Sequence, residues 1–221
     1  MDDVKRTFAF LLLFTLMVLY ACKEEKRTAE QEAPEEKNKL AEPTQPVRQK
    51  EKDRTAYTNL DWLDEGNKVV SAAFASLSSH LKAAVEKGGV QEAVQYCHLN
   101  AYPLVDSLSK AHEALIRRTS LKVRNPKNLP DRLEERALHR VKQMLAEGKT
   151  VEPWVEYYPE DVAYYAPIYV QGVCLKCHGT PGKTISSQDY AFIKERYPED
   201  EATGYKEGDW RGLWSIRFAR K

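Results

Sequence analysis

The sequence predicts an α+β fold in which long helices come first and an antiparallel sheet follows. Between positions 63 and 85, apolar residues recur at three-, four- and seven-residue intervals, as on one face of a long helix. From position 154 onward the apolar period changes to two, which is typical of half-buried strands. Because helices and strands do not alternate, we expect an antiparallel sheet with one helix laid across it.

The first predicted helix has its apolar stripe on Leu63, Val70, Phe74, Leu77, Leu81 and Val85. Gly88 and Gly89 follow this stripe and are expected to end the helix, because glycine is common just after a helix C-terminus. A second helix is expected to start near Val90, and Pro103 is expected to break or restart it.

A third helix is expected from Asp131, a suitable N-cap residue, to Gly148. Apolar residues that recur at helical spacing are expected to form the buried face of this helix. The predicted strands lie at 115–123, 154–157, 162–170 and 212–218. A hairpin is expected between the second and third of these strands.

Length and charge limit the classes of protein. The chain has 221 residues and a formal net charge of +1, which gives no electrostatic reason to expect a nucleic acid as partner. Residues 56–221 are enough for one domain with its own core. The 12 tyrosines and 4 tryptophans could build that core or enclose a flat cofactor.

Residues 1–22 resemble the signal segment of a bacterial lipoprotein. Lys5 and Arg6 precede an apolar run over 8–20, shorter than the about 20 residues that span a bilayer. The run ends Leu-Tyr-Ala-Cys, similar to a lipobox, so Cys22 is expected to become the lipid-modified first residue of an exported protein. An uncleaved anchor is the alternative.

Residues 23–55 differ from the rest in composition. They are rich in charges of both signs, contain three prolines and have no aromatic residue. Such a stretch cannot bury enough apolar surface to offset the entropy cost of ordering, so we expect a disordered tether. As a random coil it would hold the domain on the order of 30 Å from a membrane.

The strongest motif is Cys174-Leu175-Lys176-Cys177-His178, the attachment signature for c-type haem. Two thiols at this spacing can reach the two vinyl groups on one edge of a porphyrin, and the next residue can supply the proximal imidazole. A zinc site, a thioredoxin-like pair and a plain disulfide are the alternatives. They are weaker, because the zinc ligands are too few, no βαβ unit is visible, and a disulfide leaves His178 unexplained.

If Cys22 takes lipid and the motif takes haem, Cys97 has no thiol partner. It is either a small buried residue on its helix or the distal iron ligand. The spacing ranks Cys97 and His98 nearly equal as that ligand, with Met144 behind them.

The segment Val94-Gln95-Tyr96-Cys97, the segment 116–130 (IRRTSLKVRNPKNLP) and the haem motif with Gly179 together resemble a family of monohaem c-type domains. The resemblance covers residues from Ala93 to Phe218. It implies a PAS-like sensor fold, a single covalent haem and a histidine/cysteine ligand pair, which favours Cys97 over His98.

The positive charges of the segment 116–130 suit pairing with haem propionates. We take Arg117, Arg118 and Arg124 as candidates, together with Lys122. Since alternate residues of a strand face opposite ways, Arg117 and Arg118 cannot both face the haem. The alternative is a solvated strand face followed by a turn.

A haem with two protein ligands has no open position, which argues against turnover chemistry and against an enzyme. We expect a redox or gas sensor, lipid-anchored to a membrane on the periplasmic side or at the cell surface, that acts on a separate redox or signalling protein. A periplasmic electron carrier is the second hypothesis and a peroxidase-like enzyme the third. The helix over 63–85 could join two copies in a homodimer or simply pack in the core.

Overall fold

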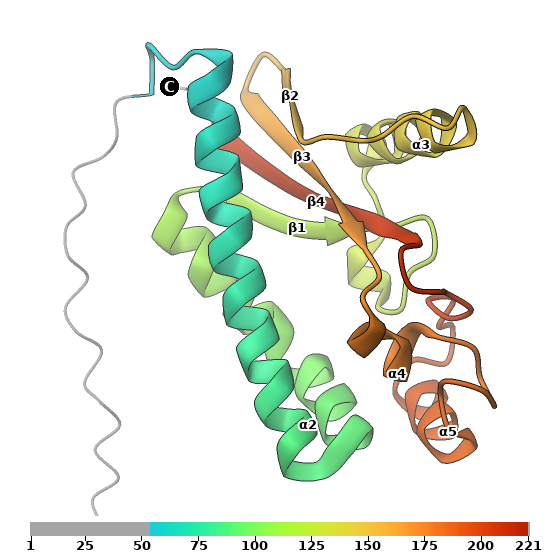
Figure 1. The fold of residues 1–221 in the computed structure, drawn as a ribbon. Coiled ribbons are helices and arrows are strands. Elements are labelled where there is room, and N and C mark those ends of the chain that lie inside the picture. Colours follow the sequence, from blue (N-terminus) through green and yellow to red (C-terminus); the bar gives the residue numbers. More distant parts are fainter. Residues whose placement is uncertain (1–53, 221) are drawn as a thin grey trace, which may run out of the picture. The chain divides into compact units, whose positions relative to one another are not determined.

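The computed structural model describes residues 54–220, so the predicted signal segment, Cys22 and nearly all of the predicted tether lie outside it. The elements are α2 (Asn59–His112), β1 (Leu115–Thr119), η1 (Pro126–Asn128), α3 (Arg132–Ala146), β2 (Trp154–Tyr157), β3 (Asp161–Tyr169), η2 (Gly172–Cys174), α4 (Leu175–His178), α5 (Ser187–Arg196) and β4 (Trp210–Ala219) (Figure 1). The predicted α+β class is confirmed, and the PAS-like arrangement stays a prediction. Within the described range, no helix is both long and apolar enough to cross a bilayer.

The four strands form one antiparallel sheet in the order β1-β4-β3-β2. The predicted hairpin is present, with Trp154 opposite Tyr165 and Tyr157 opposite Val162. Helices cover both faces of the sheet, α2 on one and α3 on the other, where we expected a single helix across it (Figure 1). The alternation along each strand explains this, because both sets of alternate residues are apolar.

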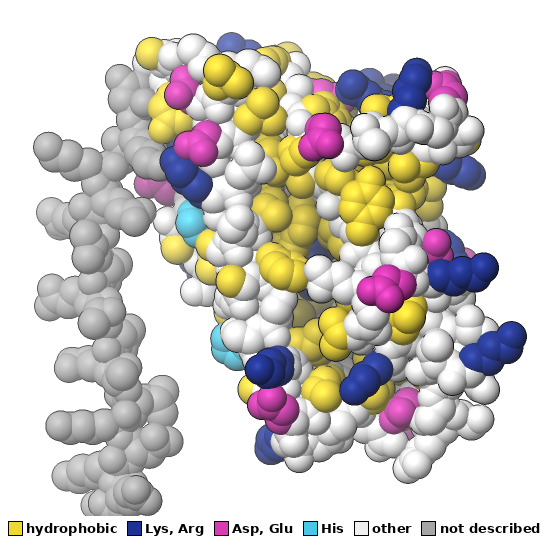
Figure 2. Space-filling view, viewed as in Figure 1, with side chains coloured by type: hydrophobic (Ala, Val, Ile, Leu, Met, Phe, Trp, Pro, Cys, Tyr) yellow, Lys and Arg dark blue, Asp and Glu magenta, His cyan; other side chains and the backbone are white. Residues whose placement is uncertain are grey.

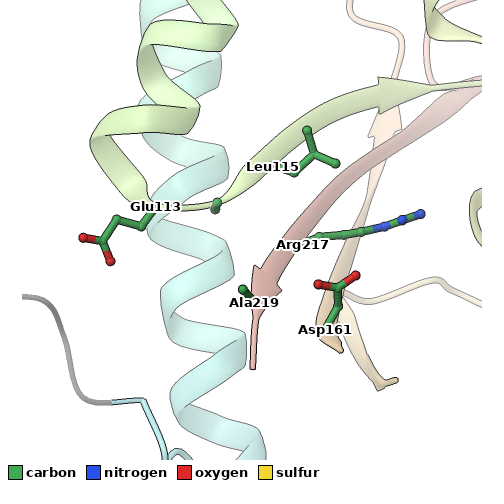
Figure 3. A pocket seen from close by; sticks show the side chains of 6 residues that line it. Glu113, Leu115, Asp161, Arg217 and Ala219 are labelled. Atoms are coloured by element: carbon green, nitrogen blue, oxygen red, sulfur yellow. The ribbon is translucent and has the colours of Figure 1, made fainter. Parts of the chain in front are cut away.

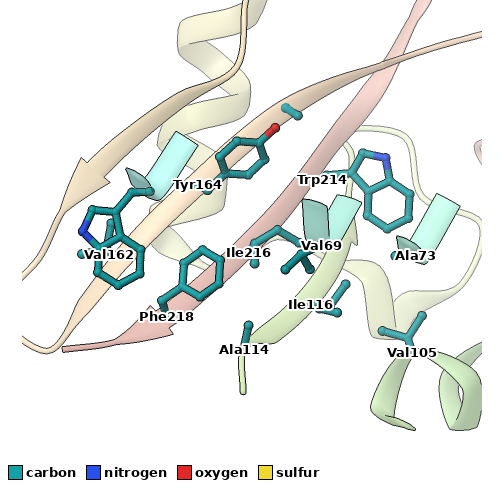
Figure 4. Close-up of a cluster of buried hydrophobic side chains, with 12 residues drawn as sticks. Val69, Ala73, Val105, Ala114, Ile116, Val162, Tyr164, Trp214, Ile216 and Phe218 are labelled. Carbon is teal, nitrogen blue, oxygen red and sulfur yellow. The ribbon is translucent and has the colours of Figure 1, made fainter. Parts of the chain in front are cut away.

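Two hydrophobic clusters lie on the two faces of the sheet. The cluster under α2 includes Val69, Ile116, Val162, Tyr164, Trp214, Ile216 and Phe218 (Figure 4). The cluster under α3 includes Leu138, Val141, Ala163, Tyr165 and Leu213. Consecutive residues of β3 therefore pack against different helices, which fixes the register of this strand at both faces.

The two halves of α2 meet at a glycine pair, as predicted. Gly88 and Gly89 have non-helical dihedrals, and the φ of Gly89 is +71°, in the region that glycine adopts without strain. The prediction for Pro103 is wrong, because the second half of α2 continues through it to His112. Pro103 is exposed, and the carbonyl of exposed Leu99, which loses its amide partner there, can be hydrated.

The first strand is shorter than predicted. β1 ends at Thr119 rather than at position 123, because the Ser120 hydroxyl accepts a hydrogen bond from the Lys122 amide at 3.1 Å. The same hydroxyl donates to the Arg211 carbonyl at 2.7 Å. Serine side chains that bond to nearby backbone in this way compete with a strand ladder. The residues that follow are thereby released to contact the loop before β4.

Buried tyrosines predict a loss of stability at high pH. Burial raises the pKa of Tyr164 to about 12, while an unfolded tyrosine titrates near 10. Because the folded-state pKa lies above the unfolded one, the contribution of this residue to stability is fully present below pH 10. It falls as the pH rises toward 12, by up to roughly 3 kcal/mol. Urea unfolding from pH 8 to 11.5 tests this, with Tyr164→Phe expected to reduce the slope above pH 10. An unchanged slope in that variant would contradict the assignment.

Candidate functional site

The Cys-Xaa-Xaa-Cys-His motif lies just after β3, and α5 packs against α4, which carries the second cysteine and the histidine. Cys174 closes η2, and Cys177 and His178 lie on the single turn of α4 (Figure 1). Both thiols are free and half-buried. Burial raises the pKa of the Cys177 thiol to about 11, so this group is a neutral thiol at pH 7.

The chain must turn directly after His178. A Cβ atom on Gly179 would lie 2.6 Å from the Leu175 carbonyl oxygen and 1.9 Å from Oγ1 of Thr184. The Gly179 amide donates to that same Leu175 carbonyl at 3.0 Å, which closes the α4 turn. No side chain fits there without displacing backbone, so the glycine after the motif is a steric requirement.

The imidazole of His178 has a defined tautomer. Its Nδ1 atom lies 2.8 Å from the carbonyl oxygen of Ala202, which can only accept, so Nδ1 carries the hydrogen. Burial, followed by Arg124 and Arg211, holds the pKa of His178 well below its usual range, so the ring is neutral at pH 7. The lone pair of Nε2 is therefore free to coordinate a metal such as iron.

Cys97 lies on the second half of α2, near the motif. Burial raises the pKa of its thiol, and the charges of Arg118 and Arg124 oppose that rise. Val94, one turn earlier on α2, belongs to a hydrophobic cluster against which Cys177 packs, so this stretch of α2 lies beside the motif.

The two other candidate distal ligands lie in different surroundings. The ring of His98 is exposed and packs edge-on against Tyr197, with the ring centroids 5.3 Å apart. Met144 lies on α3 and packs in the cluster on the opposite face of the sheet, with Val141 and Tyr165. The structure therefore separates Met144 from the motif.

The three candidate arginines have different partners. Arg117 faces α3 and pairs with the buried carboxylate of Glu134, with Nε 2.8 Å from Oε1, so the structure does not bring it to the motif. Arg124 pairs with Asp200. Arg118 stacks over the ring of Trp214 at 5.8 Å and has no hydrogen bond or ion pair with any residue between 54 and 220. The predicted opposite orientation of Arg117 and Arg118 is confirmed.

The sequence did not predict that the loop 200–205 belongs to the site. Ala202 supplies the carbonyl that fixes His178, and Tyr205 packs edge-on against the imidazole with the ring centroids 6.5 Å apart. No sequence signal identifies a backbone carbonyl as a partner. Asp200 lies within an acidic run, Glu199-Asp200-Glu201, where its burial does not show in the sequence.

A shallow pocket lies at the opposite end of β3, away from the motif. Its lining includes Glu113 and Leu115 at the junction of α2 and β1, and Asp161, Arg217 and Ala219 at the ends of the neighbouring strands (Figure 3). None of the predicted site residues lines it, so it is a separate feature.

The fold and site together define an α+β domain that holds a Cys-Xaa-Xaa-Cys-His segment beside a four-stranded antiparallel sheet. The sequence model of the Tll0287-like family matches residues 25–219, and the chain therefore belongs to the Tll0287-like family. The crystal structure of the cyanobacterial heme-protein Tll0287 is similar, with 27% identity and a TM-score of 0.53 over 72% of this chain and 96% of that chain. No curated protein sequence matches.

Proposed function

We propose that this protein carries one covalently attached c-type haem and works as a redox- or gas-responsive sensor. Cys174 and Cys177 would form the two thioethers, and His178 would be the proximal ligand. A relative of known structure is a heme-protein, which supports haem as the cofactor. The haem would supply a one-electron iron couple at this site.

The hydrogen bond from His178 to the Ala202 carbonyl is the observation that carries this proposal. A histidine that binds a metal through Nε2 commonly donates its Nδ1 hydrogen to a backbone carbonyl or a carboxylate. That bond fixes the ring orientation and makes the free nitrogen a better donor. A zinc site gains no support from the same region, because no cluster of three or more His, Cys, Asp or Glu residues suited to a metal occurs between residues 54 and 220.

Cys97 is the residue that we assign as the distal ligand. Its place on α2, one turn after Val94 of the cluster that packs against Cys177, supports this choice, whereas Met144 is on the other face of the sheet. A thiolate donates electron density to the iron and so favours the ferric state, which predicts a low reduction potential.

Arg118 is the residue that we expect to pair with a haem propionate. Its guanidinium is half-buried, and unlike Arg117 and Arg124 it lacks a carboxylate partner among the described residues. A cation in that position is stabilised by an anionic group of the cofactor. Hydrophobic side chains also line the seam between α2 and the sheet on the face drawn in Figure 2, a surface suited to a flat apolar ring.

Export and anchoring belong to the same proposal. Covalent haem attachment takes place outside the cytoplasm, which agrees with a lipoprotein-type signal ending at Cys22. The segment 23–55 would tether the domain at the periplasmic side of a membrane or at the cell surface, where a separate redox or signalling protein would receive the response.

Mass spectrometry of protein produced with a haem-maturation system tests the proposal. We expect the mass of one tetrapyrrole on the peptide that contains Cys174 and Cys177, because thioether bonds survive denaturation. The variant Cys174→Ala/Cys177→Ala is expected to lose that mass completely, and Cys97→Ser is the matched control that keeps it. Wild-type protein without the added mass would overturn the proposal.

A further inference from the structure

Three consecutive residues that follow β1, Lys122 to Arg124, form hydrogen bonds with the loop 200–205. Lys122 donates from Nζ to the Thr203 carbonyl at 2.6 Å, and the Val123 carbonyl accepts from the Glu201 amide at 3.0 Å. Arg124 donates from Nε and from a terminal nitrogen to the two carboxylate oxygens of Asp200, at 3.1 and 3.0 Å. These three neighbouring residues of the segment 116–130 therefore all bind the same loop.

The same loop holds the motif through its backbone. The Ala202 carbonyl accepts from His178 Nδ1 at 2.8 Å, while the amide of Tyr205 donates to the His178 carbonyl at 3.0 Å. The amide of Gly204 donates to the Gly179 carbonyl at 2.8 Å. The imidazole and the two peptide units that follow it are therefore fixed by this loop.

Arg124 and Asp200 join the two sets of contacts. Besides its ion pair, Arg124 donates to the Cys177 carbonyl at 2.6 Å, so one guanidinium contacts both the motif and the loop. Oδ1 of Asp200 accepts from Arg124 and also from the amide of Ala202, at 2.9 Å. Ala202, which orients His178, is thus held in place by the carboxylate of Asp200. Arg124 neutralises that carboxylate.

We propose that Arg124 and Asp200 are positioning residues that set the orientation of the His178 imidazole through the Ala202 carbonyl. The Asp200 side chain is fully buried, and such a carboxylate is stable only while it is paired and hydrogen-bonded. This assigns Arg124 to the protein scaffold rather than to a haem propionate. The consequence for the iron rests on the proposed function, but the positioning of the imidazole does not.

A second ion pair of the same kind provides a matched control. Arg117 and Glu134 also join a half-buried guanidinium to a fully buried carboxylate, at 2.8 Å, but on the α3 face of the sheet. Glu134→Gln should therefore destabilise the domain much as Asp200→Asn does. Only Asp200→Asn should disturb His178.

The experiment compares wild type, Asp200→Asn and Glu134→Gln, all produced as the full chain with a haem-maturation system. Hydrogen exchange is measured at the amides of Gly204 and Tyr205, and electron paramagnetic resonance is recorded on the ferric protein. Loss of the charge-assisted bonds in Asp200→Asn should speed exchange at these two amides by about tenfold or more. It should also shift or broaden the resonance signal, while Glu134→Gln leaves both readouts as in wild type.

Two results would overturn the positioning role: unchanged exchange at both amides in Asp200→Asn, or equal acceleration in Glu134→Gln. If Asp200→Asn does not fold, Arg124→Lys keeps a cation beside Asp200 but loses the paired hydrogen bonds of the guanidinium, and it should accelerate the same amides to a smaller extent. Wild-type protein without a tetrapyrrole mass would defeat the proposed function, whereas the exchange comparison would still decide the role of Arg124 and Asp200.

Discussion

Replacing Cys97 by serine is expected to abolish the thiolate-type low-spin ferric signal of the haem-loaded protein. Serine has nearly the same size as cysteine, so the packing of α2 is kept, but its hydroxyl is a poor ligand for ferric iron. The reduction potential should rise as well, because the electron density that thiolate donates to the ferric iron is lost. Electron paramagnetic resonance and a redox titration of the same sample measure both effects.

The controls for this prediction are the two residues that compete with Cys97. His98→Gln and Met144→Leu should leave the thiolate signal intact, since His98 packs on Tyr197 and Met144 lies under α3. A bis-histidine spectrum that persists in Cys97→Ser and disappears in His98→Gln would transfer the assignment to His98. Ligand exchange on reduction or on addition of a small gas would favour a sensor, and unchanged ligation a plain electron carrier.

Replacing Gly66 by alanine is expected to lower the free energy of unfolding by about 3 kcal/mol, because a methyl group there overpacks the core. The new Cβ would lie 2.1 Å from Cδ2 and 2.2 Å from Cγ of Tyr164. That ring is 1% exposed, and its hydroxyl donates to Asn67 at 2.7 Å, so it has no free direction in which to move. Urea denaturation measures the change, which corresponds to a fall in Tm of roughly 10 °C.

The control is Ser71→Ala, an exposed position on the same helix, which should change stability by less than about 0.5 kcal/mol. Adding Tyr164→Leu to Gly66→Ala should recover part of the loss, because the smaller side chain leaves room for the methyl group. If Gly66→Ala has the stability of wild type, α2 does not approach β3 as closely as described.

Local sequence predicted the elements whose periodicity belongs to a single segment. α3 begins after the predicted cap Asp131 and the β2–β3 hairpin has the predicted partners, since each depends on neighbours within a few residues. β1 and Pro103 were predicted less well. The end of β1 depends on two bonds of the Ser120 hydroxyl, one with the nearby Lys122 amide and one with the distant Arg211 carbonyl, and no pattern of spacing reports the second.

The candidate site, too, was predicted from the sequence only in part. The two thiols and the histidine of the motif are recognised from spacing alone, because thioether attachment needs them on one short turn. The roles of the three arginines could not be read from the sequence, where Arg117, Arg118 and Arg124 look equivalent. Their partners come from α3, from β4 and from the loop 200–205, and only folding brings these together.

The sequence by itself therefore determined the α+β class, the family resemblance and the haem-type motif, all of which depend on residues close together in the chain. The tertiary structure alone decided which carbonyl orients His178, which arginine remains without a carboxylate partner among residues 54–220, and which face of the sheet holds Met144. The physical reason is that hydrogen bonds, ion pairs and burial join residues separated by up to a hundred positions. A pattern of spacing cannot record such contacts.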